Sequence, residues 1–90
     1  MQNKKTNTVH ESVSSRLLVM ANTLERMGKV HQALEPYLKI IEKYPDTPEV
    51  STAIEKVLMI ADDMRKVGQF HVAMRVYERL EKADEAKNEE

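Results

Sequence analysis

Histidine is the side chain in this sequence best suited to chemistry, and two of the three histidines, His31 and His71, lie 40 residues apart. Imidazole transfers protons near neutral pH and is a common metal ligand. A metal site on a helix needs a second histidine four residues away, or cysteines at ligand spacing. The sequence has no cysteine, and neither histidine has such a partner. We therefore predict that the chain binds no metal and no cofactor.

The carboxylates and serines do not form a catalytic set either. Asp62 and Asp63 are sequence neighbours, as are Glu89 and Glu90, so the members of each pair point in different directions. No serine lies in a nucleophile-elbow pattern, and the two glycines cannot form a phosphate-binding loop. A catalytic site also needs a pocket with converging groups, which so short a chain hardly encloses. We predict that this protein is not an enzyme.

Composition limits the class of protein further. A chain of 90 residues is enough for one domain. Its net charge is −1 with charges of both signs, and the basic stripe of a nucleic-acid-binding protein is absent. No secretory signal follows the N-terminal lysines, and no apolar run approaches the roughly 18–20 residues of a membrane span. We expect a cytoplasmic protein that binds neither nucleic acid nor a membrane.

The sequence repeats itself at a spacing of 40 residues. The matching residues are Gly28, His31, Ala33 and Tyr37 in the first copy, and Gly68, His71, Ala73 and Tyr77 in the second. A further set lies upstream, with Leu17, Met20, Ala21 and Leu24 matching Val57, Ile60, Ala61 and Met64. A period of roughly 20–50 residues is typical of stacked-repeat proteins. Such units bury their apolar faces on one another and leave an extended surface for binding.

Apolar residues recur at helical spacing in four stretches, and no stretch alternates as a strand does. This periodicity predicts helices over about residues 9–27, 30–43, 48–67 and from 70 onward. The short connections make the helices two antiparallel hairpins. Gly28 and Gly68 are predicted to end the first and third helices, because glycine tolerates the left-handed conformation required there.

Other residues signal where helices begin or bend. Thr8 followed by Glu11 predicts a capping box at the start of the first helix. Thr47 and Pro48 predict the N-cap and first turn of the third helix. Pro36 lies inside the second helix and is expected to kink it.

These elements predict one domain over residues 8–85, with one repeat over about 9–45 and a second over about 47–83. Residues 1–7 are expected to be disordered, and residues 86–90 are expected to fray. The six methionines could form a promiscuous binding surface. Since Met20, Met64 and Met74 fall at core positions, we predict instead that they pack inside.

The repeated positions resemble the tetratricopeptide repeat, a helix–turn–helix unit of about 34 residues. The first copy matches its pattern at Leu17, Met20, Ala21, Leu24, Gly28, Ala33, Tyr37, Ile40 and Pro45. The second copy matches at Val57, Ile60, Ala61, Met64, Gly68, Ala73, Tyr77 and Leu80. The resemblance implies an all-α fold in which two antiparallel helix hairpins stack as a short right-handed α-solenoid. A plain four-helix bundle, without a concave groove, is the alternative.

The chain departs from the family pattern in three ways. Its period is 40 residues, with an insertion near residues 48–53, and Glu85 stands where the second copy would have its closing proline. There are also only two copies, whereas about three are usually needed for stability. This last departure suggests that another surface completes the stack.

In tetratricopeptide repeats the first helix of each hairpin lines a concave groove, and this position carries over to ten residues here. They are Ser15, Leu18, Asn22, Glu25 and Arg26 in the first copy, and Glu55, Leu58, Asp62, Arg65 and Lys66 in the second. Leu18 and Leu58 occupy matching positions and would form an apolar centre flanked by charge. Such a groove suits an amphipathic helix or an extended peptide. The alternative is a solvated helix face with two surface leucines.

The clamp that binds C-terminal carboxylates in some members of the family pairs a lysine with an asparagine four positions later. Asn22 is present, but Leu18 replaces the lysine, so this activity is disfavoured. The resemblance therefore implies an adaptor, scaffold or small chaperone that binds a protein or peptide.

The last helix offers a second candidate surface. It carries more apolar residues than one face can bury, and a further repeat would cover Val72 and Val76 in a longer array. A second copy of the chain could cover them instead, which would make the protein a homodimer or a larger assembly. These valines could equally be ordinary residues of a helix surface.

Overall fold

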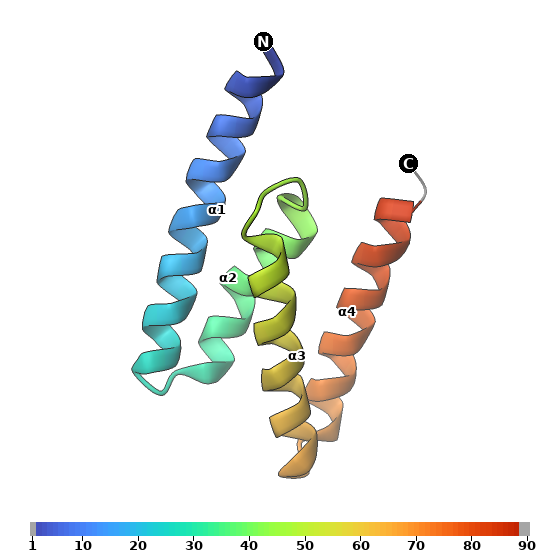
Figure 1. The fold of residues 1–90 in the computed structure, drawn as a ribbon. Helices are drawn as coiled ribbons and strands as arrows, with labels where there is room; N and C mark the ends of the chain where they lie inside the picture. The colour runs from blue at the N-terminus through green and yellow to red at the C-terminus, as the bar shows by residue number, and fades with distance from the viewer. Residues whose placement is uncertain (1, 89–90) are drawn as a thin grey trace.

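The computed structural model describes the backbone of residues 2–88 and the side chains of residues 8–86. Within this range all regular secondary structure is α-helical. The helices are α1 (Gln2–Arg26), α2 (Val30–Lys43), α3 (Val50–Lys66) and α4 (Phe70–Asn88). Figure 1 shows them side by side, with α1 and α4 at the two outer sides and α2 and α3 between them. The predicted all-α class is confirmed, and α2 has the predicted bounds.

The two hairpins turn in the same way, at the two glycines that the repeat predicted. Gly28 has φ 80° and Gly68 has φ 89°, both in the left-handed region. After α1, the amide of Gly28 donates to the carbonyl of Glu25 and the amide of Lys29 to that of Leu24. After α3, Gly68 and Gln69 make the equivalent two bonds. This pair of hydrogen bonds to the last helical turn is the Schellman motif. Glycine favours it because the left-handed conformation is not hindered by a Cβ.

The ends of the chain differ from prediction. α1 begins at Gln2, so residues 2–7 continue the helix where an irregular segment was expected. Thr8 therefore lies inside α1, and the predicted capping box with Glu11 is wrong. α4 extends to Asn88, beyond the residue at which fraying was expected to begin. Residues 1, 89 and 90, which belonged to the predicted disordered and frayed ends, lie outside the described residues.

The start of α3 also differs from prediction, because Thr47 does not cap it. The helix begins at Val50, three residues later, with Glu49 in the N-cap position and no side-chain cap. Thr47 is buried and its hydroxyl donates to the carbonyl of Tyr44 over 2.8 Å. The same hydroxyl lies 2.8 Å from that of Ser14 in α1. Thr47 thus ties the α2–α3 connection to α1 instead of starting a helix.

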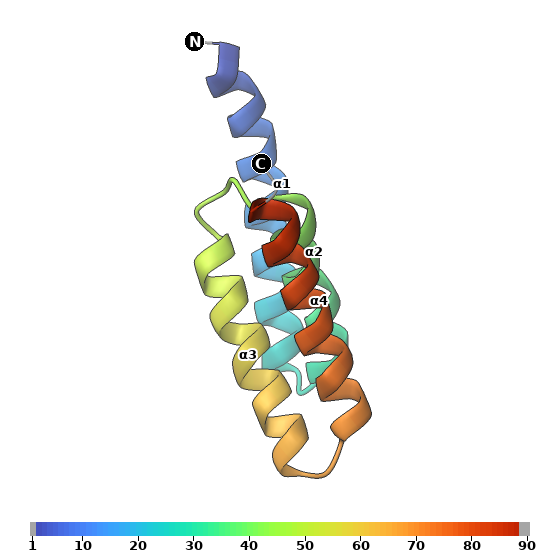
Figure 2. The same ribbon diagram turned by 90° about the vertical axis from the view of Figure 1, so that its right-hand side faces the viewer.

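The core is centred on α2. Each helix packs on the next one along the chain, and α2 also contacts α4. The molecule is a slab of 49 × 32 × 14 Å, whose narrow side is seen in Figure 2. Since α2 meets α1, α3 and α4, half of its residues are buried: Ala33, Leu34, Pro36, Tyr37, Leu38, Ile40 and Ile41.

The methionine prediction is right at one position of three. Met64 is buried, but Met20 and Met74 are both more than half exposed. Met20 lines the boundary between α1 and α2, and Met74 lines a hollow between α3 and α4. Neither is fully covered within the described residues. Helical spacing identified apolar positions of the helices but not whether a neighbouring helix covers them.

Candidate functional site

The α1 half of the predicted groove is partly used to hold the first hairpin together. The hydroxyl oxygen of Tyr37 lies 2.7 Å from Oδ1 of Asn22 and 2.6 Å from Oε1 of Glu25, so two acceptors share its proton. Burial, with the hydrogen bond and negative charge of Glu25, raises the pKa of Tyr37 far above its ordinary value of 10.0. Lys56 of α3 lies 3.5 Å from the same Glu25 oxygen. Asn22 and Glu25 are therefore already engaged within the chain.

Between α1 and α3 the structure brings together three predicted residues, Asn22, Glu25 and Arg26. They line a shallow hollow of about 530 Å³ together with Val19 and Lys56. The prediction missed these two residues, although both lie on the helices it named. Most of the lining side chains are polar or charged, and Lys56 already pairs with Glu25. Val19 is the one apolar residue in this lining.

The predicted apolar centre of the groove is not found, because its two leucines have different surroundings. Leu18 is half-buried and packs against the protein's own core. Leu58 is 44% exposed and faces α4 instead of α1, in a different groove. Ser15 and Glu55 are exposed. Of these two matching pairs, Leu18 and Leu58 differ in exposure and Ser15 and Glu55 do not.

The remaining predicted residues form a charged cluster on the last turns of α3. Asp62 lies 2.6 Å from Arg65 and 3.5 Å from Lys66. The hydrogen bond from Arg65, helped by the positive charge of both residues, lowers the pKa of Asp62. These pairs are one helical turn apart and well solvated, so they support the helix only weakly.

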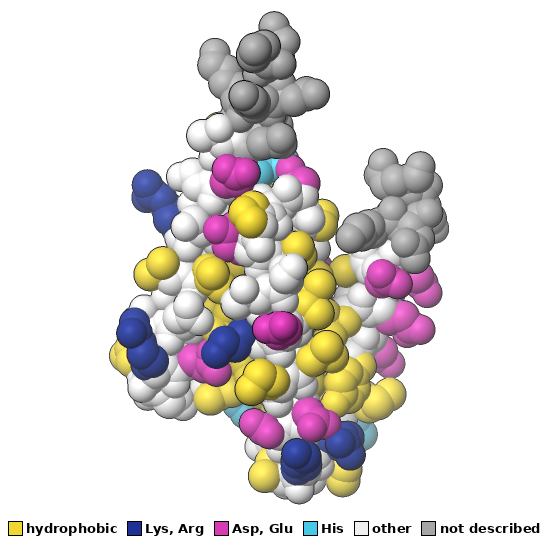
Figure 3. Space-filling view, viewed as in Figure 1, with side chains coloured by type: hydrophobic (Ala, Val, Ile, Leu, Met, Phe, Trp, Pro, Cys, Tyr) yellow, Lys and Arg dark blue, Asp and Glu magenta, His cyan; other side chains and the backbone are white. Residues whose placement is uncertain are grey.

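A largely apolar groove lies between α3 and α4, and we call it the α3–α4 groove. It has a volume of about 580 Å³. Its lining is Ile41, Pro45, Val50, Ile54, Leu58, Met74, Tyr77, Glu78, Leu80, Glu81, Ala83 and Asp84. Figure 3 shows hydrophobic side chains gathered between the two helices and acidic side chains along the outer side of α4. Leu58 is the one residue of the predicted groove that belongs to it.

The repeat reveals what this groove corresponds to in the first half of the molecule. Leu34 in α2 is 5% exposed, while its counterpart Met74 is 54% exposed. Ser14 in α1 is fully buried, while its counterpart Ile54 is 37% exposed. The first-repeat face is covered by α3, α4 and the connection before α3, and nothing within the described residues covers the second-repeat face. The 40-residue period contained this information, since it relates six of the groove residues to buried ones: Ile54, Met74, Tyr77, Glu78, Leu80 and Glu81.

The valines proposed for self-association lie on the opposite side of α4. Val76 is 4% exposed and Val72 is half-buried, and both line the boundary with Leu34 and Leu38 of α2. The prediction that a second copy of the chain covers these valines is wrong for Val76, because α2 of the same chain already buries it, and Val72 lines the same boundary. They bind the two hairpins to each other.

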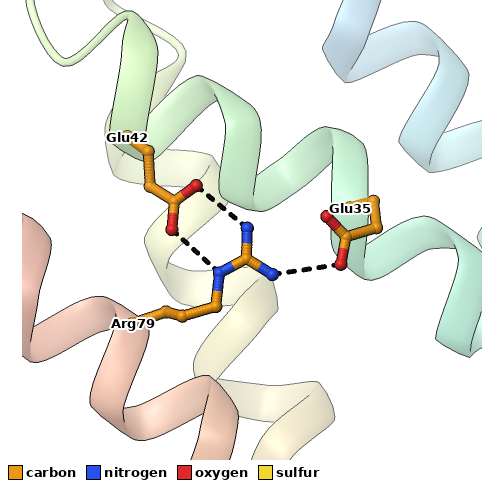
Figure 4. Close-up of polar contacts among 3 residues, drawn as sticks. All are labelled: Glu35, Glu42 and Arg79. Atoms are coloured by element: carbon orange, nitrogen blue, oxygen red, sulfur yellow. Dashed lines mark hydrogen bonds and ion pairs between the residues drawn. The ribbon is translucent and has the colours of Figure 1, made fainter.

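At the edge of that boundary Arg79 of α4 forms ion pairs with Glu35 and Glu42 of α2. Arg79 was not identified from the sequence. Its guanidinium donates two hydrogen bonds of 2.9 Å to the carboxylate of Glu42 and one of 3.0 Å to Glu35 (Figure 4). The hydrogen bonds to Glu42, more than those to Glu35, raise the pKa of Arg79 well above its usual range. A paired, planar geometry of this kind fixes the orientation of α4 on α2.

The histidines lie apart from one another. His31 and His71 are exposed in the first turns of α2 and α4, and His10 pairs with Asp46 over 2.9 Å. Among the side chains of residues 8–86, no three histidine, cysteine, aspartate or glutamate residues gather as a metal site would require. None of the helices over residues 2–88 combines the length and the apolar character of a membrane span.

No protein-family model, curated protein or solved structure matches this chain. The relation between its own two repeats is therefore the comparison that bears on function.

Proposed function

We propose that this protein is a non-enzymatic interaction module that binds a helical segment of another protein. The α3–α4 groove carries the proposal, because it keeps the apolar surface that a helix covers in the first repeat. An exposed apolar surface rimmed by polar residues is typical of a protein interface. Binding of an amphipathic helix in an apolar groove is a common form of peptide recognition.

We further propose that the two hairpins are stacked as in the tetratricopeptide repeat and do not form a closed bundle. Three observations support this arrangement: the identical turns at Gly28 and Gly68, the packing of each helix on the next, and the thin slab shape. A four-helix bundle closes its core with the first and last helices. In Figure 1 these helices are instead at opposite sides of the molecule.

The α1–α3 surface is the less suitable of the two candidate grooves. Its Asn22 and Glu25 are engaged by Tyr37, and Leu18 packs inside. The α3–α4 groove instead leaves Ile54, Leu58 and Met74 exposed. A protein partner also fits the charge of the chain better than a nucleic acid does, since the net charge is −1 and the groove carries carboxylates.

A display selection tests this function without knowledge of the natural partner. The library would hold 17-residue helices, the length of α3, with a fixed apolar stripe and all other positions random. It would be panned against the wild-type protein, the double variant Ile54→Glu/Leu58→Glu, and Met59→Glu as a control. Met59 is 61% exposed and neighbours Leu58, but does not line the groove.

We expect helices that bind the wild type and the Met59→Glu control but not the double variant, because two carboxylates in the groove oppose an apolar partner. All three proteins should keep the same helical content by circular dichroism, since the changed side chains are exposed. Clones that bind all three proteins equally would rule the groove out as the binding site.

A further inference from the structure

We infer that the α3–α4 groove selects a partner helix whose apolar stripe is flanked by lysine or arginine on the side that meets α4. This inference rests on the proposed function and adds the chemistry of the partner. It draws on the charge of the groove rim, on the way in which the two repeats differ, and on the poor fit of a second copy of the chain.

The rim that α4 contributes to the groove is acidic. Glu78, Glu81 and Asp84 line it, and no lysine or arginine is among the described residues that do so. Figure 3 shows acidic side chains along α4 beside the hydrophobic surface. Complementary charges at the edge of an interface favour one partner over others and orient it.

The carboxylates occupy positions that are apolar or aromatic in the first repeat. Forty residues earlier, Glu78 corresponds to Leu38 and Glu81 to Ile41, both of which are buried. The last repeat of an array usually has a polar outer face for solubility, which would account for these changes on α4 alone.

α3 shows the opposite trend, which a solubilising end does not account for. Its Ile54 replaces the Ser14 of α1, and its Val50 replaces His10. The exposed face of α3 is thus more apolar than the covered face of α1. A groove that is more apolar on one side and acidic on the other fits a basic amphipathic helix.

A second copy stacked head to tail fits this face poorly. Between the two repeats, Arg79 forms ion pairs with Glu35 and Glu42. If a second copy continued the stack, its Lys39 would take the place of Arg79. Arg75 and Lys82 of the first copy would take the places of Glu35 and Glu42. The ion pairs would thus be replaced by a cluster of like charges, which is unfavourable at an interface.

A two-fold dimer formed groove to groove is disfavoured for a related reason. Symmetric contacts use the same patch on both chains, so Glu78 and Glu81 of both copies would lie at one interface. A helix with basic flanks meets neither problem. We therefore assign the groove to a different protein.

Two synthetic helical peptides test the inference. Both would carry an apolar stripe at the spacing of Ala53, Val57, Ile60, Ala61 and Met64, the face that α3 buries. They would differ only in the flanks, which are lysine in one and glutamate in the other. Binding would be measured by fluorescence anisotropy at about 0.05 M and about 0.5 M salt, where screening is weak and strong respectively.

We expect the lysine peptide to bind about tenfold more tightly at low salt, the effect of a few solvent-exposed charge pairs, and less so at high salt. The double variant Glu78→Lys/Glu81→Lys should reverse the preference. A matched control, Glu55→Lys/Asp63→Lys, makes the same change in net charge on exposed residues of α3 that do not line the groove. The control should keep the preference for lysine.

The other outcomes separate the inference from the proposed function. Equal binding of both peptides, or a reversal in the control as well, overturns the charge inference and leaves the groove as a binding site. Binding of neither peptide, with no helices enriched in the display selection, overturns both. A wild-type dimer in sedimentation equilibrium that Leu58→Glu dissociates would show that a second copy occupies the groove, which also overturns the inference.

Discussion

The first and second repeats use the same local sequence signals but have different surroundings. In the first repeat, the outer face of the hairpin is covered by α3 and α4, and Leu34, Leu38 and Ile41 are almost fully buried. In the second repeat, the equivalent face is the α3–α4 groove. Matching residues therefore differ in exposure because a second hairpin packs on the first repeat.

The two matching tyrosines show the same difference on a smaller scale. Tyr37 is fully buried and its hydroxyl contacts Asn22 and Glu25. Tyr77 is half-buried in the groove and interacts with Arg65, the counterpart of Glu25. The same residue is a structural anchor in one repeat and part of a candidate binding surface in the other.

The largest change in the free energy of unfolding is expected at the matching positions Leu38 and Glu78, when each residue is replaced by the type found at the other. Leu38→Glu removes a buried leucine and puts a carboxylate into the boundary between α2 and α4, beside Val72 and Val76. The lost packing and the cost of burying the charge should lower the free energy of unfolding by about 3–5 kcal/mol. The reverse change, Glu78→Leu, alters an exposed position and should change it by less than about 0.5 kcal/mol. Urea unfolding followed by circular dichroism would measure both. Similar effects in the two variants would contradict the difference in burial.

Removing one hydroxyl should distinguish the tyrosines. Tyr37→Phe should cost about 1–2 kcal/mol, because Asn22 and Glu25 lose a buried donor, whereas Tyr77→Phe should cost less than about 0.5 kcal/mol. Urea unfolding of both variants at neutral pH measures the difference. Equal losses would mean that the bonds of Tyr37 contribute little.

The same tyrosine predicts a loss of stability in alkali. Since the pKa of Tyr37 is raised in the folded protein from its ordinary value of 10.0, the unfolded chain releases this proton first. The contribution of Tyr37 is therefore complete below pH 10 and is lost as the pH rises above it. The free energy of unfolding should fall more steeply above this pH in the wild type than in Tyr37→Phe. Parallel curves for the two proteins would contradict the raised pKa.

The turns should respond alike in the two repeats, which makes them a control for the comparison. Gly28→Ala and Gly68→Ala force a side chain into the left-handed region, although a Cβ at either site would meet no atom within 4 Å. Each should cost about 1 kcal/mol, for conformational reasons alone. Thermal unfolding would test whether the two losses agree. A much larger loss in one repeat would mean that the turns are not equivalent.

The smallest change in the free energy of unfolding is expected for the ion pairs of Arg79 between the repeats. Arg79→Met keeps most of the side chain's packing but removes its bonds to Glu35 and Glu42, and should cost about 0.5–1 kcal/mol at low salt. Lys39→Met, at the matching position in the first repeat, should change stability by less than about 0.3 kcal/mol. When the free energy of unfolding is measured again at high salt, the difference between the two variants should become smaller. A salt-independent loss would point to packing instead of charge.

Much of the fold could be predicted from the sequence, but the candidate site could not. Helical spacing and the two glycines located the helices of each hairpin, because these signals are local. Thr47 was misread because its hydroxyl is engaged by Ser14, which lies 33 residues away. Val76 was misread because helical spacing identifies an apolar face but not the neighbour that covers it.

The sequence by itself determined four helices and the turns between paired helices, since both depend on contacts within a few residues. Its 40-residue period also determined the correspondence between the repeats. Only the tertiary structure decided which of two matching faces is buried. The first repeat is followed by a hairpin that covers Leu34, while the described chain after the second repeat has none to cover Met74. Burial depends on neighbours distant in sequence, and for this reason the α3–α4 groove became visible only in the folded chain.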